Sequence, residues 1–335
     1  MAFNIPVCIF IFKRSDLAVR VISQLKKIKP KKIYLLADGP RNPNEEVEIK
    51  ETRKIVECEI TWDCTVIKFY NKNNVGVIDN IGGGALKVFK KEKFAIFLED
   101  DNFPSLSFFS YCEELLKRYE NNEKLLWICG TNYLENIETL SSDSYFFTKN
   151  LLPCGWASWA NKFNRYYDHN LTSFIPNPET KKQLKSKYRL KALFRQQYFN
   201  FKKTKYLIQN NRQKASWDYQ MAYSIHKHDL FGIMPNKNLI QNIGVDGRSS
   251  HGGTSMKKTM TNRFCWMSNK ELDFPLIHPT KIACNDEIEE LISKIILIPL
   301  LNRIAIFLFR YLKTLLGIGK YTTFSEIKKN VSNRL

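Results

Sequence analysis

The sequence lacks the cysteine patterns of disulfide-rich and zinc-binding proteins. It contains 8 cysteines and 5 histidines, but no two cysteines stand in the Cys-x-x-Cys spacing, and none groups with a histidine as metal ligands do. Neither a disulfide-stapled secreted domain nor a zinc module is indicated. We expect most of the cysteines to be buried, reduced thiols of a cytoplasmic protein.

Long uncharged hydrophobic runs are absent as well. No basic segment followed by an apolar run and a cleavage site predicts a signal peptide at the N-terminus. The apolar stretch 291–320 never reaches the roughly 18 uncharged residues of a membrane span, because four cations interrupt it: Lys294, Arg303, Arg310 and Lys313. From Leu300 onward, basic and apolar residues fall on opposite helical faces. This predicts an amphipathic helix on a membrane surface or, alternatively, one packed against protein.

Acidic residues are scarce relative to basic ones. The 335 residues include 33 Asp and Glu against 52 Lys and Arg, a formal net charge of +19. Nucleic acid, an anionic membrane or a phosphorylated substrate would complement this charge. Residues 180–217 hold 12 of the cations, several aromatics and no acidic residue. They fit a nucleic-acid surface, a solvated helix face with aromatics turned inward, or a flap facing a membrane or lipid diphosphate. Since no nucleic-acid fold motif is present, we expect no nucleic-acid partner.

The N-terminal third alternates buried strands with amphipathic helices. Runs of β-branched and aromatic residues such as IPVCIFIF (5–12) are typical of strands buried on both faces of a parallel sheet. Leu17, Val21 and Leu25 recur at helical spacing after this run. The pattern predicts a doubly wound α/β fold, with strands at 5–12, 31–38, 64–70 and 94–98 and helices at 15–28, 43–58 and 78–91.

Polar side chains follow three of these strands. Lys13 and Arg14 come after the first, Asp38 and Gly39 after the second, and the triplet Glu-Asp-Asp (99–101) after the fourth. Ligands of such sheets bind beyond the carboxyl ends of the strands. Adjacent carboxylates repel each other, so a triplet after a buried strand indicates a shared cation or proton. The clusters predict a site for a nucleotide diphosphate bridged by a metal, although acidic triplets also occur on solvated loops.

Several segments resemble inverting glycosyltransferases with the GT-A fold, the family of N-acetylglucosaminyltransferase I and of bacterial surface-polysaccharide glycosyltransferases. FLEDDNFPSLSFFSYCEELLKRY resembles the metal-site segment, VCIFIFKRS and YLLADGP the nucleotide-binding strands, and NVGVIDNIGGGALKVF the helix before the metal strand. LLPCGWASWANKF, SWDYQMAYSI and MPNKNLIQNIGVDGRSSHGG are similar to later segments of the family. The matches run in family order over about residues 5–255, leaving 176–214 unmatched. The resemblance implies the GT-A (Rossmann-like) fold.

The resemblance assigns roles to the acidic triplet. Asp101 would coordinate Mn²⁺ or Mg²⁺, and His251 would contact the metal or the diphosphate, with Ser250 as an additional phosphate donor. Asp100 would contact the ribose or a metal-bound water, and Glu99 the uracil or the sugar. The implied donor is a nucleotide-diphospho-sugar, with UDP as the expected nucleotide.

Further donor contacts are implied outside the triplet. Asp38 would hold the uracil and Arg14 the base or ribose, although Asp-Gly-Pro is also a common turn and many arginines lie on the surface. The spacing of Trp156 and Trp159 predicts that they lie near each other on a helix. In the family, this segment floors the donor and acceptor pocket, so Gly155 and Trp156 are expected to line it. Such aromatic pairs are also common in protein cores.

The resemblance places the chemistry on Asp218, in the segment SWDYQMAYSI. Inversion at the anomeric carbon is an in-line displacement. It requires a carboxylate on the acceptor side to take the hydroxyl proton. Helical spacing follows Asp218, so the alternative role for its side chain is to cap a helix.

We expect a GT-A catalytic domain over residues 1–260, divided into a nucleotide-binding region (residues 1–110) and an acceptor region (residues 111–260) with a basic insert at 180–216. A membrane-associating helical extension, 261–335, follows it. The implied function is metal-dependent, inverting sugar transfer to a glycan or lipid-linked glycan in surface polysaccharide or lipopolysaccharide synthesis, at the inner face of the cytoplasmic membrane. One alternative is a sugar-phosphate nucleotidyltransferase, which normally carries a Gly-rich loop that FKRSDLAVR lacks. The other is an inactive glycan-binding or membrane-binding module.

Overall fold

The structure is a computed structural model of the chain and describes residues 3–138, 140–245, 259–322 and 327. The chain divides into two compact units, residues 1–294 and residues 295–335. The first unit continues well beyond residue 260, where the sequence placed the end of the catalytic domain. Residues 261–294 therefore belong to the body of the protein.

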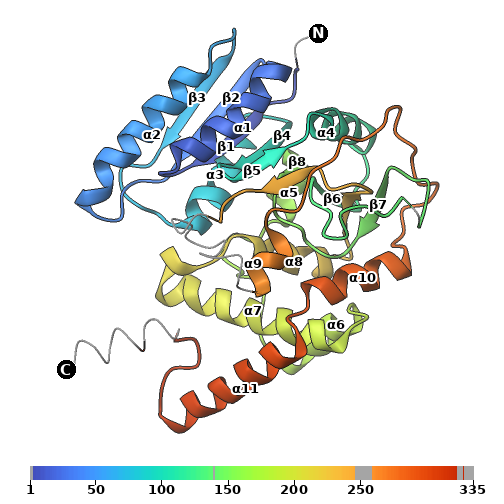
Figure 1. Ribbon diagram of the computed structural model, residues 1–335. Helices are drawn as coiled ribbons and strands as arrows, with labels where there is room; N and C mark the ends of the chain where they lie inside the picture. The colour runs from blue at the N-terminus through green and yellow to red at the C-terminus, as the bar shows by residue number, and fades with distance from the viewer. Residues whose placement is uncertain (1–2, 139, 246–258, 323–326, 328–335) are drawn as a thin grey trace. The chain divides into compact units, whose positions relative to one another are not determined.

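The first unit is built on an eight-stranded mixed sheet (Figure 1). Its strands are β1 (Val7–Ile11), β2 (Lys32–Ala37), β3 (Thr65–Tyr70), β4 (Phe94–Glu99), β6 (Leu125–Cys129), β7 (Tyr145–Thr148), β8 (Trp156–Trp159) and β9 (Phe231–Pro235). They lie in the order β3-β2-β1-β4-β8-β6-β9-β7. The first four are parallel, whereas β8 runs antiparallel to both β4 and β6. The predicted Rossmann-like α/β fold class is confirmed, in a form consistent with GT-A.

The N-terminal helices follow the predicted alternation. They are α1 (Ser15–Ile28), η1 (Pro43–Glu45), α2 (Glu46–Glu59), the π-helical turn η2 (Ile78–Gly82), α3 (Gly83–Val88) and, after the short strand β5 (Asn102–Pro104), α4 (Ser107–Arg118). The predicted range of α1 is confirmed. It buries Leu17, Val21 and Leu25, and it ends where the left-handed Lys29 (φ 48°) donates its N–H to Leu25 O. The helix expected over 78–91 is a π turn followed by a short α-helix.

The C-terminal half of the chain contains most of the remaining helices. Its further elements are α5 (Ala160–Tyr166), α6 (Pro178–Ser186), α7 (Lys191–Asn210), η3 (Arg212–Lys214), α8 (Asp218–Lys227), β10 (Ile240–Asn242), α9 (Thr259–Phe264), α10 (Asp286–Ile296) and α11 (Leu300–Leu315). The basic stretch 180–217 forms most of α6 and α7. Its aromatics Phe194, Tyr198 and Phe201 pack inward against Tyr223 of α8. The solvated-face interpretation is therefore confirmed for these aromatics.

The tryptophans of GWASW lie on a strand, so the prediction of a helix is wrong. Because side chains alternate along β8, residues three apart point to opposite faces of the sheet. Trp156 stacks between Phe97 (ring centroids 4.0 Å apart) and Trp127 (4.3 Å). On the other face, Trp159 Nε1 donates a hydrogen bond of 2.8 Å to Leu116 O. The four-residue apolar segment cannot by periodicity alone distinguish helix from strand.

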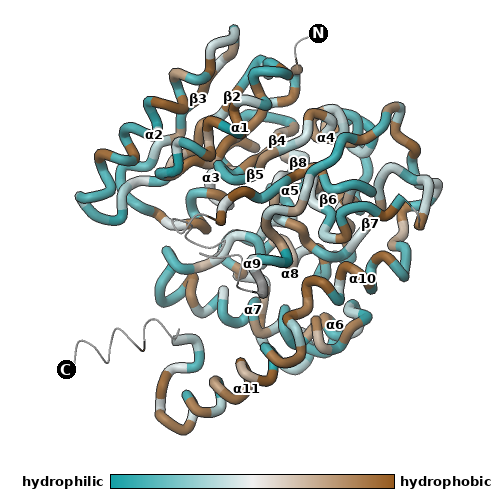
Figure 2. The backbone as a smooth tube through the Cα atoms, in the orientation of Figure 1, coloured by the Kyte–Doolittle hydropathy of each residue, from teal (hydrophilic) through white to brown (hydrophobic). Residues whose placement is uncertain are grey.

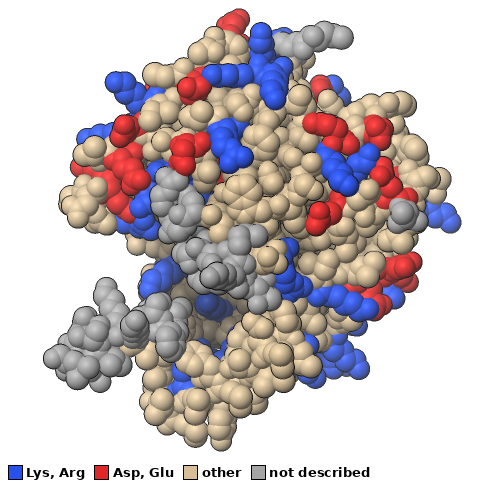
Figure 3. Space-filling view, in the orientation of Figure 1, with Lys and Arg blue, Asp and Glu red and all other residues tan. Residues whose placement is uncertain are grey.

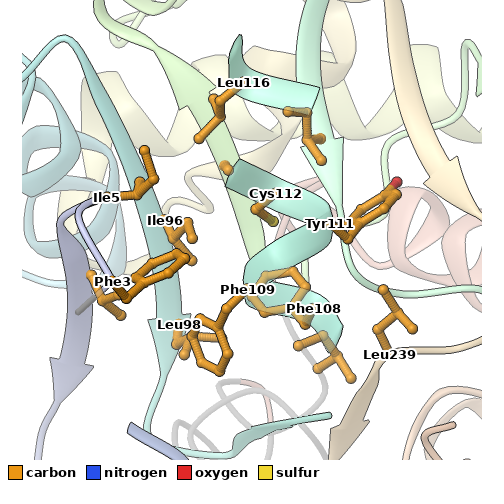
Figure 4. Packing of buried hydrophobic residues seen from close by; sticks show 14 of the residues in the cluster. Phe3, Ile5, Ile96, Leu98, Phe108, Phe109, Tyr111, Cys112, Leu116 and Leu239 are labelled. Carbon is orange, nitrogen blue, oxygen red and sulfur yellow. The ribbon is translucent and has the colours of Figure 1, made fainter. Parts of the chain in front are cut away.

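The main hydrophobic core lies between the sheet and the helices beside it. Figure 4 shows Phe108, Phe109 and Cys112 of α4 facing Ile96 and Leu98 of β4. All five side chains are buried, and at roughly 25 cal/mol per Å² of apolar surface such burial is the main stabilising contribution. All eight cysteines are thiols without a disulfide, as predicted, but only Cys8, Cys112, Cys129 and Cys265 are buried, so the expectation that most of them are buried is not met.

The second unit contains α11, whose sequence is mostly hydrophobic along the helix (Figure 2). The Lys313 ammonium donates to the carbonyls of Lys320 (3.0 Å) and Thr322 (2.7 Å), closing the turn after the helix. Among the described residues, no single helix is long and apolar enough to cross a membrane. Taken together, α10 and α11 have the length and composition of a span, but a bend of 49° separates them.

Candidate functional site

A cavity of about 410 Å³ opens at the carboxyl ends of β1, β2 and β4. In the sheet, β2 and β4 lie on opposite sides of β1. The chain connections beside β1 therefore leave the carboxyl ends of the strands in opposite directions and create a crevice. Such a crevice is the usual ligand site of these sheets. The three predicted polar clusters all contribute to its wall, together with residues of loop 74–81. Its lining includes Phe12, Lys13, Arg14, Asp38, Arg41, Asn74, Gly76, Glu99, Asp100, Asp101, Cys154, Gln213 and Asn242.

Arg14 joins the first cluster to the third. Its guanidinium donates to Asp100 Oδ1 and, over 2.8 Å, to Asp101 Oδ2. Burial disfavours the charge on Arg14, but the two carboxylates outweigh burial and raise the pKa of Arg14 further above its ordinary value. Gly244 packs against this pair, since a Cβ there would lie 2.2 Å from Asp101 Oδ2. The chain thus brings one cation to two carboxylates from a neighbouring strand.

The acidic triplet carries more negative charge than Arg14 can neutralise. Burial, followed by the charges of Asp101 and Asp100, raises the pKa of Glu99 above that of an ordinary glutamate. Burial also raises the pKa of Asp100, although Arg14 opposes the rise. Asp101 Oδ1 accepts a hydrogen bond of 2.8 Å from Asn102 Nδ2. The repulsion among these carboxylates would be relieved by a bound cation or a shared proton.

Asp38 is committed to organising the neighbouring loop. Its buried carboxylate accepts hydrogen bonds from the N–H groups of Gly39 (2.8 Å), Val75 (2.9 Å) and Gly76 (3.0 Å) and from the Asn74 amide (2.9 Å). Gly76 needs to be glycine because its φ is +83°. Asp38 lines the cavity, but its oxygens are occupied by the protein. This arrangement disfavours the expected role in holding uracil.

Arg41 and Phe12 are cavity residues that the sequence analysis missed. The Arg41 guanidinium lies over the Phe12 ring, 5.1 Å from its centroid, and donates to both carboxylate oxygens of Glu45. The hydrogen bonds from Arg41 lower the pKa of Glu45 to about 2. The available signal was their position beside the clusters considered, since Phe12 follows β1 directly and Arg41 comes two residues after Gly39. Together they offer a planar surface on which a base or ribose can rest.

Gly155 and Trp156 lie behind the cavity wall. Trp156 is 1% exposed, and Gly155, at φ +60°, donates its N–H to Asn102 Oδ1 over 2.9 Å. Neither belongs to the described lining of the cavity, to which their neighbours Pro153 and Cys154 do belong. The segment supports the pocket through its packing, so the expectation that these two residues line it is not met.

Asp218 is the first residue of α8. The N-cap position belongs to Trp217, whose side chain makes no capping hydrogen bond, so Asp218 is not itself the N-cap residue. Ser216 Oγ donates to Asp218 Oδ1. After the larger effects of burial, Asp101 and Asp100, the charge of Asp218 adds to the raised pKa of Glu99. Asp218 itself is not part of the described lining of the cavity, which includes Gln213 five residues earlier in the chain.

Ser250 and His251 lie outside the described residues. Within the described portion of the chain, no group of three or more His, Cys, Asp or Glu is arranged as a metal site. What the described residues provide is a cavity with two metal-competent carboxylates, a buried arginine and a further carboxylate on a separate helix. Such a set can bind a charged ligand and accept a proton beside it.

No protein-family model matches this sequence, and no curated protein matches it. The chain is similar to the solved structures of S. aureus TarS 1–349 (12% identity, TM-score 0.39), a UDP-glucose pyrophosphorylase complexed with UDP-glucose (11%, 0.36) and mouse xyloside xylosyltransferase 1 in its apo form (12%, 0.37). These matches cover 72%, 72% and 68% of this chain and 60%, 94% and 84% of the other chains. At these TM-scores the similarity carries no conclusion about the reaction.

Proposed function

We propose that this chain is a glycosyltransferase that moves a sugar from a nucleotide-diphospho-sugar, with UDP as the expected nucleotide, to a glycan acceptor. One juxtaposition carries the proposal. A cavity lined by Arg14 and the acidic triplet lies at the switch point of the sheet, and its lining also includes Gln213, five residues before the carboxylate of Asp218 at the start of α8. The first group suits a diphosphate, and the second, on a separate helix, suits the acceptor.

The donor half of the proposal rests on the cavity wall. Its volume of about 410 Å³ falls within the range of small-molecule sites. Arg14 and Lys13 provide cations for phosphate oxygens, and the Phe12–Arg41 surface suits the base or ribose. A nucleotide diphosphate therefore finds charge and stacking partners along one wall.

The chemical half rests on Asp218. A bond forms between the acceptor hydroxyl oxygen and the anomeric carbon while the bond to the diphosphate breaks on the opposite side. In the proposal, the Asp218 carboxylate takes the hydroxyl proton and the nucleoside diphosphate leaves. Displacement from the side opposite the leaving group inverts the anomeric centre. Arg14 stabilises the negative charge that develops on the departing diphosphate.

The carboxylates fit a divalent cation in part. Asp100 and Asp101 offer hard oxygen ligands, and the diphosphate and water would supply the others, as is usual for Mg²⁺ in nucleotide enzymes. In the proposal these two residues hold Mn²⁺ or Mg²⁺ when Arg14 turns from them to a phosphate. The bound ion would stabilise charge on the leaving group.

Replacing Asp101 by alanine tests the cation site. We expect Asp101→Ala to lose the Mn²⁺-dependent component of UDP binding in calorimetry, because a hard oxygen ligand is removed from the cavity wall. Binding without Mn²⁺ should change less, and the thermal unfolding midpoint should show that the variant folds. UDP affinity that responds to Mn²⁺ as in the wild type would remove Asp101 from the cation site.

Two other functions use similar features. A sugar-phosphate nucleotidyltransferase would also bind a nucleotide here, but the loop Phe12–Arg14 contains no glycine and α1 begins immediately at Ser15. An inactive glycan-binding or membrane-binding module would have no use for Asp218 beside the triplet.

Activity of the full chain on a panel of nucleotide sugars, with and without Mn²⁺, separates the three functions. Release of free sugar or its transfer to added oligosaccharides, with nucleoside diphosphate as the other product, is the expected result. Pyrophosphate-dependent formation of nucleoside triphosphate would establish the nucleotidyltransferase. Binding without turnover of any donor would establish the inactive module.

We further propose an acceptor on an anionic membrane. On the outer side of α6 and the start of α7, five cations are exposed: Lys181, Lys182, Lys185, Lys191 and Arg195. Figure 3 shows basic side chains over the region of α6. Separately, α11 combines apolar residues with Arg303 and Arg310. These features support a lipid-linked glycan acceptor, as in surface polysaccharide or lipopolysaccharide synthesis, and a place at the inner face of the cytoplasmic membrane.

A further inference from the structure

The segment 211–217 connects the basic helix α7 to the proposed base. It contains η3, whose Gln213 lines the cavity, and it ends at Trp217, immediately before Asp218. Any shift of this segment moves Asp218 relative to the donor. The contacts that fix the segment therefore bear on the reaction.

A bidentate ion pair ties the start of this segment to the π turn η2. Arg212 Nε lies 2.7 Å from Asp79 Oδ2, and Arg212 Nη2 lies 2.7 Å from Asp79 Oδ1. Two further contacts hold the pair: Arg212 Nη1 donates to Asn170 Oδ1 (2.8 Å), and His169 Nε2 lies 2.8 Å from Asp79 Oδ1. The planar guanidinium has one orientation in which all these bonds form.

The π turn also lines the cavity. Asn80 and Ile81, which follow Asp79 in the turn, belong to the cavity wall, as does Val77 before it. Asp79 itself is absent from the described lining and pairs with Arg212 instead. Irregular π turns of this kind occur frequently at functional sites. One short element thus contacts both the donor cavity and the segment that leads to Asp218.

Two more contacts secure the rest of the segment. Gln213 packs so closely on Gly76 that a Cβ there would lie 2.6 Å from Gln213 O. Tyr167 donates its hydroxyl to Trp217 O over 2.9 Å, and a Cβ on Gly82 would lie 2.1 Å from that hydroxyl. The segment is therefore fixed to the donor side at its start, middle and end.

We propose that Asp79 and Arg212 are positioning residues, which hold segment 211–217 against the donor side so that Asp218 meets the acceptor hydroxyl in line with the leaving group. This inference rests on the proposed glycosyltransferase function. Neither residue belongs to the described lining of the cavity. Because misplacement of a catalytic group by about 1 Å can cost on the order of 100-fold in rate, a clasp of two hydrogen bonds can control turnover.

The kinetic test uses Asp79→Asn, Arg212→Gln and the double variant in the full chain. We expect each single variant to lower kcat for sugar transfer about tenfold or more, while KM for the donor and the Kd for UDP stay within about twofold. The double variant should be no slower than the singles, because both break one unit. Arg212→Lys should restore little, since an ammonium cannot form the bidentate pair. Arg165→Gln, which breaks the exposed pair with Glu123, is the control and should leave kcat unchanged.

Hydrogen exchange tests the positioning role of Asp79 and Arg212 without relying on sugar transfer. In Asp79→Asn and Arg212→Gln, the amides of 211–218 should exchange faster, whereas those of α4 should be unchanged. Unaltered exchange in 211–218, or losses of kcat and UDP affinity in equal proportion, would overturn the positioning role. A wild-type protein that transfers no sugar would overturn the glycosyltransferase, and the exchange measurement would still report whether the clasp holds the segment.

Discussion

At the scale of the residue, the acidic triplet begins at the last residue of β4 and places three carboxylates near one guanidinium, that of Arg14. That guanidinium forms salt bridges with Asp100 and Asp101. The raised pKa of Glu99 follows from its burial and from these two acidic neighbours. A carboxyl group with a raised pKa keeps its proton in the folded protein at a pH where the unfolded chain has released it. Glu99 therefore lowers the free energy of unfolding as the pH rises above the ordinary glutamate pKa.

Glu99→Gln should accordingly stabilise the protein at alkaline pH. The pKa of Glu99 is raised in the folded state, so its unfavourable contribution is absent below the ordinary glutamate pKa of about 4.3 and grows above it. We expect wild type and variant to have similar free energies of unfolding near about pH 4.5. At about pH 8 the variant should be more stable by roughly 1 to 3 kcal/mol. Urea unfolding at both pH values measures the difference.

The control for this experiment is Glu113→Gln on α4, which removes an exposed carboxylate paired with Lys117. Its stability should follow the wild type at both pH values within about 0.5 kcal/mol. A constant difference between Glu99→Gln and wild type across the pH range would show that the Glu99 carboxylate titrates normally.

The variant Asp218→Asn tests whether Asp218 acts as the general base or has only a structural role. The amide keeps the shape of the side chain and can still bond to Ser216, so folding and UDP binding should be preserved. An amide cannot take the acceptor proton, so we expect transfer to slow by roughly 10² to 10⁴. Initial rates with saturating donor and acceptor provide the measurement.

Asp229→Asn, just beyond the other end of α8, is the matched control because its carboxylate pairs with Lys149 and does not line the cavity. It should transfer sugar at nearly the wild-type rate. If Asp218→Asn does the same, Asp218 takes no part in proton transfer and another acceptor-side group must be sought.

At the scale of the element, the N-terminal third was predictable because each segment has one strong signal. The helix 15–28 has apolar residues at helical spacing and the strands have short buried runs, so their bounds agree with α1, β1, β2 and β4 within a few residues. The parallel arrangement of these strands then determines that the clusters at Arg14, Asp38 and 99–101 share one edge. The three polar clusters of the cavity wall were predictable for the same reason, whereas Phe12 and Arg41 were not identified.

The remaining elements depend on contacts between distant residues. Trp156 and Trp159 lie on β8 because that strand fills the place between β4 and β6, which no local pattern reveals. Asp38 was assigned to a ligand because its partners, 39 and 71–76, could not be identified from the sequence. The clasp between Asp79 and Arg212 joins residues 133 positions apart. Asp79 lies in the matched segment NVGVIDNIGGGALKVF and Arg212 in the unmatched stretch 176–214, so no motif links the two residues.

At the scale of the whole molecule, the net charge of +19 has an identifiable distribution. Exposed lysines and arginines of α6 and α7 belong to the stretch 180–217, which contains no acidic residue, and the aromatics of the same stretch are used in packing. The charge therefore remains available for an anionic surface after folding. The cations of α11 are Arg303, Arg310 and Lys313. The Lys313 ammonium donates hydrogen bonds to the carbonyls of Lys320 and Thr322.

The structure also shows where the C-terminal region can be divided. The buried Glu289 of α10 accepts hydrogen bonds from Thr148 Oγ1 (2.6 Å), Lys149 N (3.0 Å) and Asn150 Nδ2 (2.9 Å). Removing α10 would leave these donors next to β7 without their acceptor and destabilise the body of the protein. A cut that tests α11 alone must therefore fall after α10, in the connection 297–299.

Truncation after Ile298 is expected to release the protein from membranes while leaving its chemistry intact. The deletion removes the apolar residues of α11 together with seven Lys and Arg of residues 299–335, among them Arg303 and Arg310 of the helix, and each cation is worth about 1 kcal/mol near an anionic surface. Sedimentation with vesicles containing anionic lipid should therefore show at least a tenfold loss of binding, by roughly that estimate. Turnover of the nucleotide sugar with a soluble acceptor should be unchanged.

Neutral vesicles serve as the control, because the charge-dependent component of the binding of the full chain should be absent there. An insoluble or inactive truncated protein would instead mean that α11 packs on the catalytic unit, since exposing a hydrophobic surface that normally lies within the protein leads to aggregation.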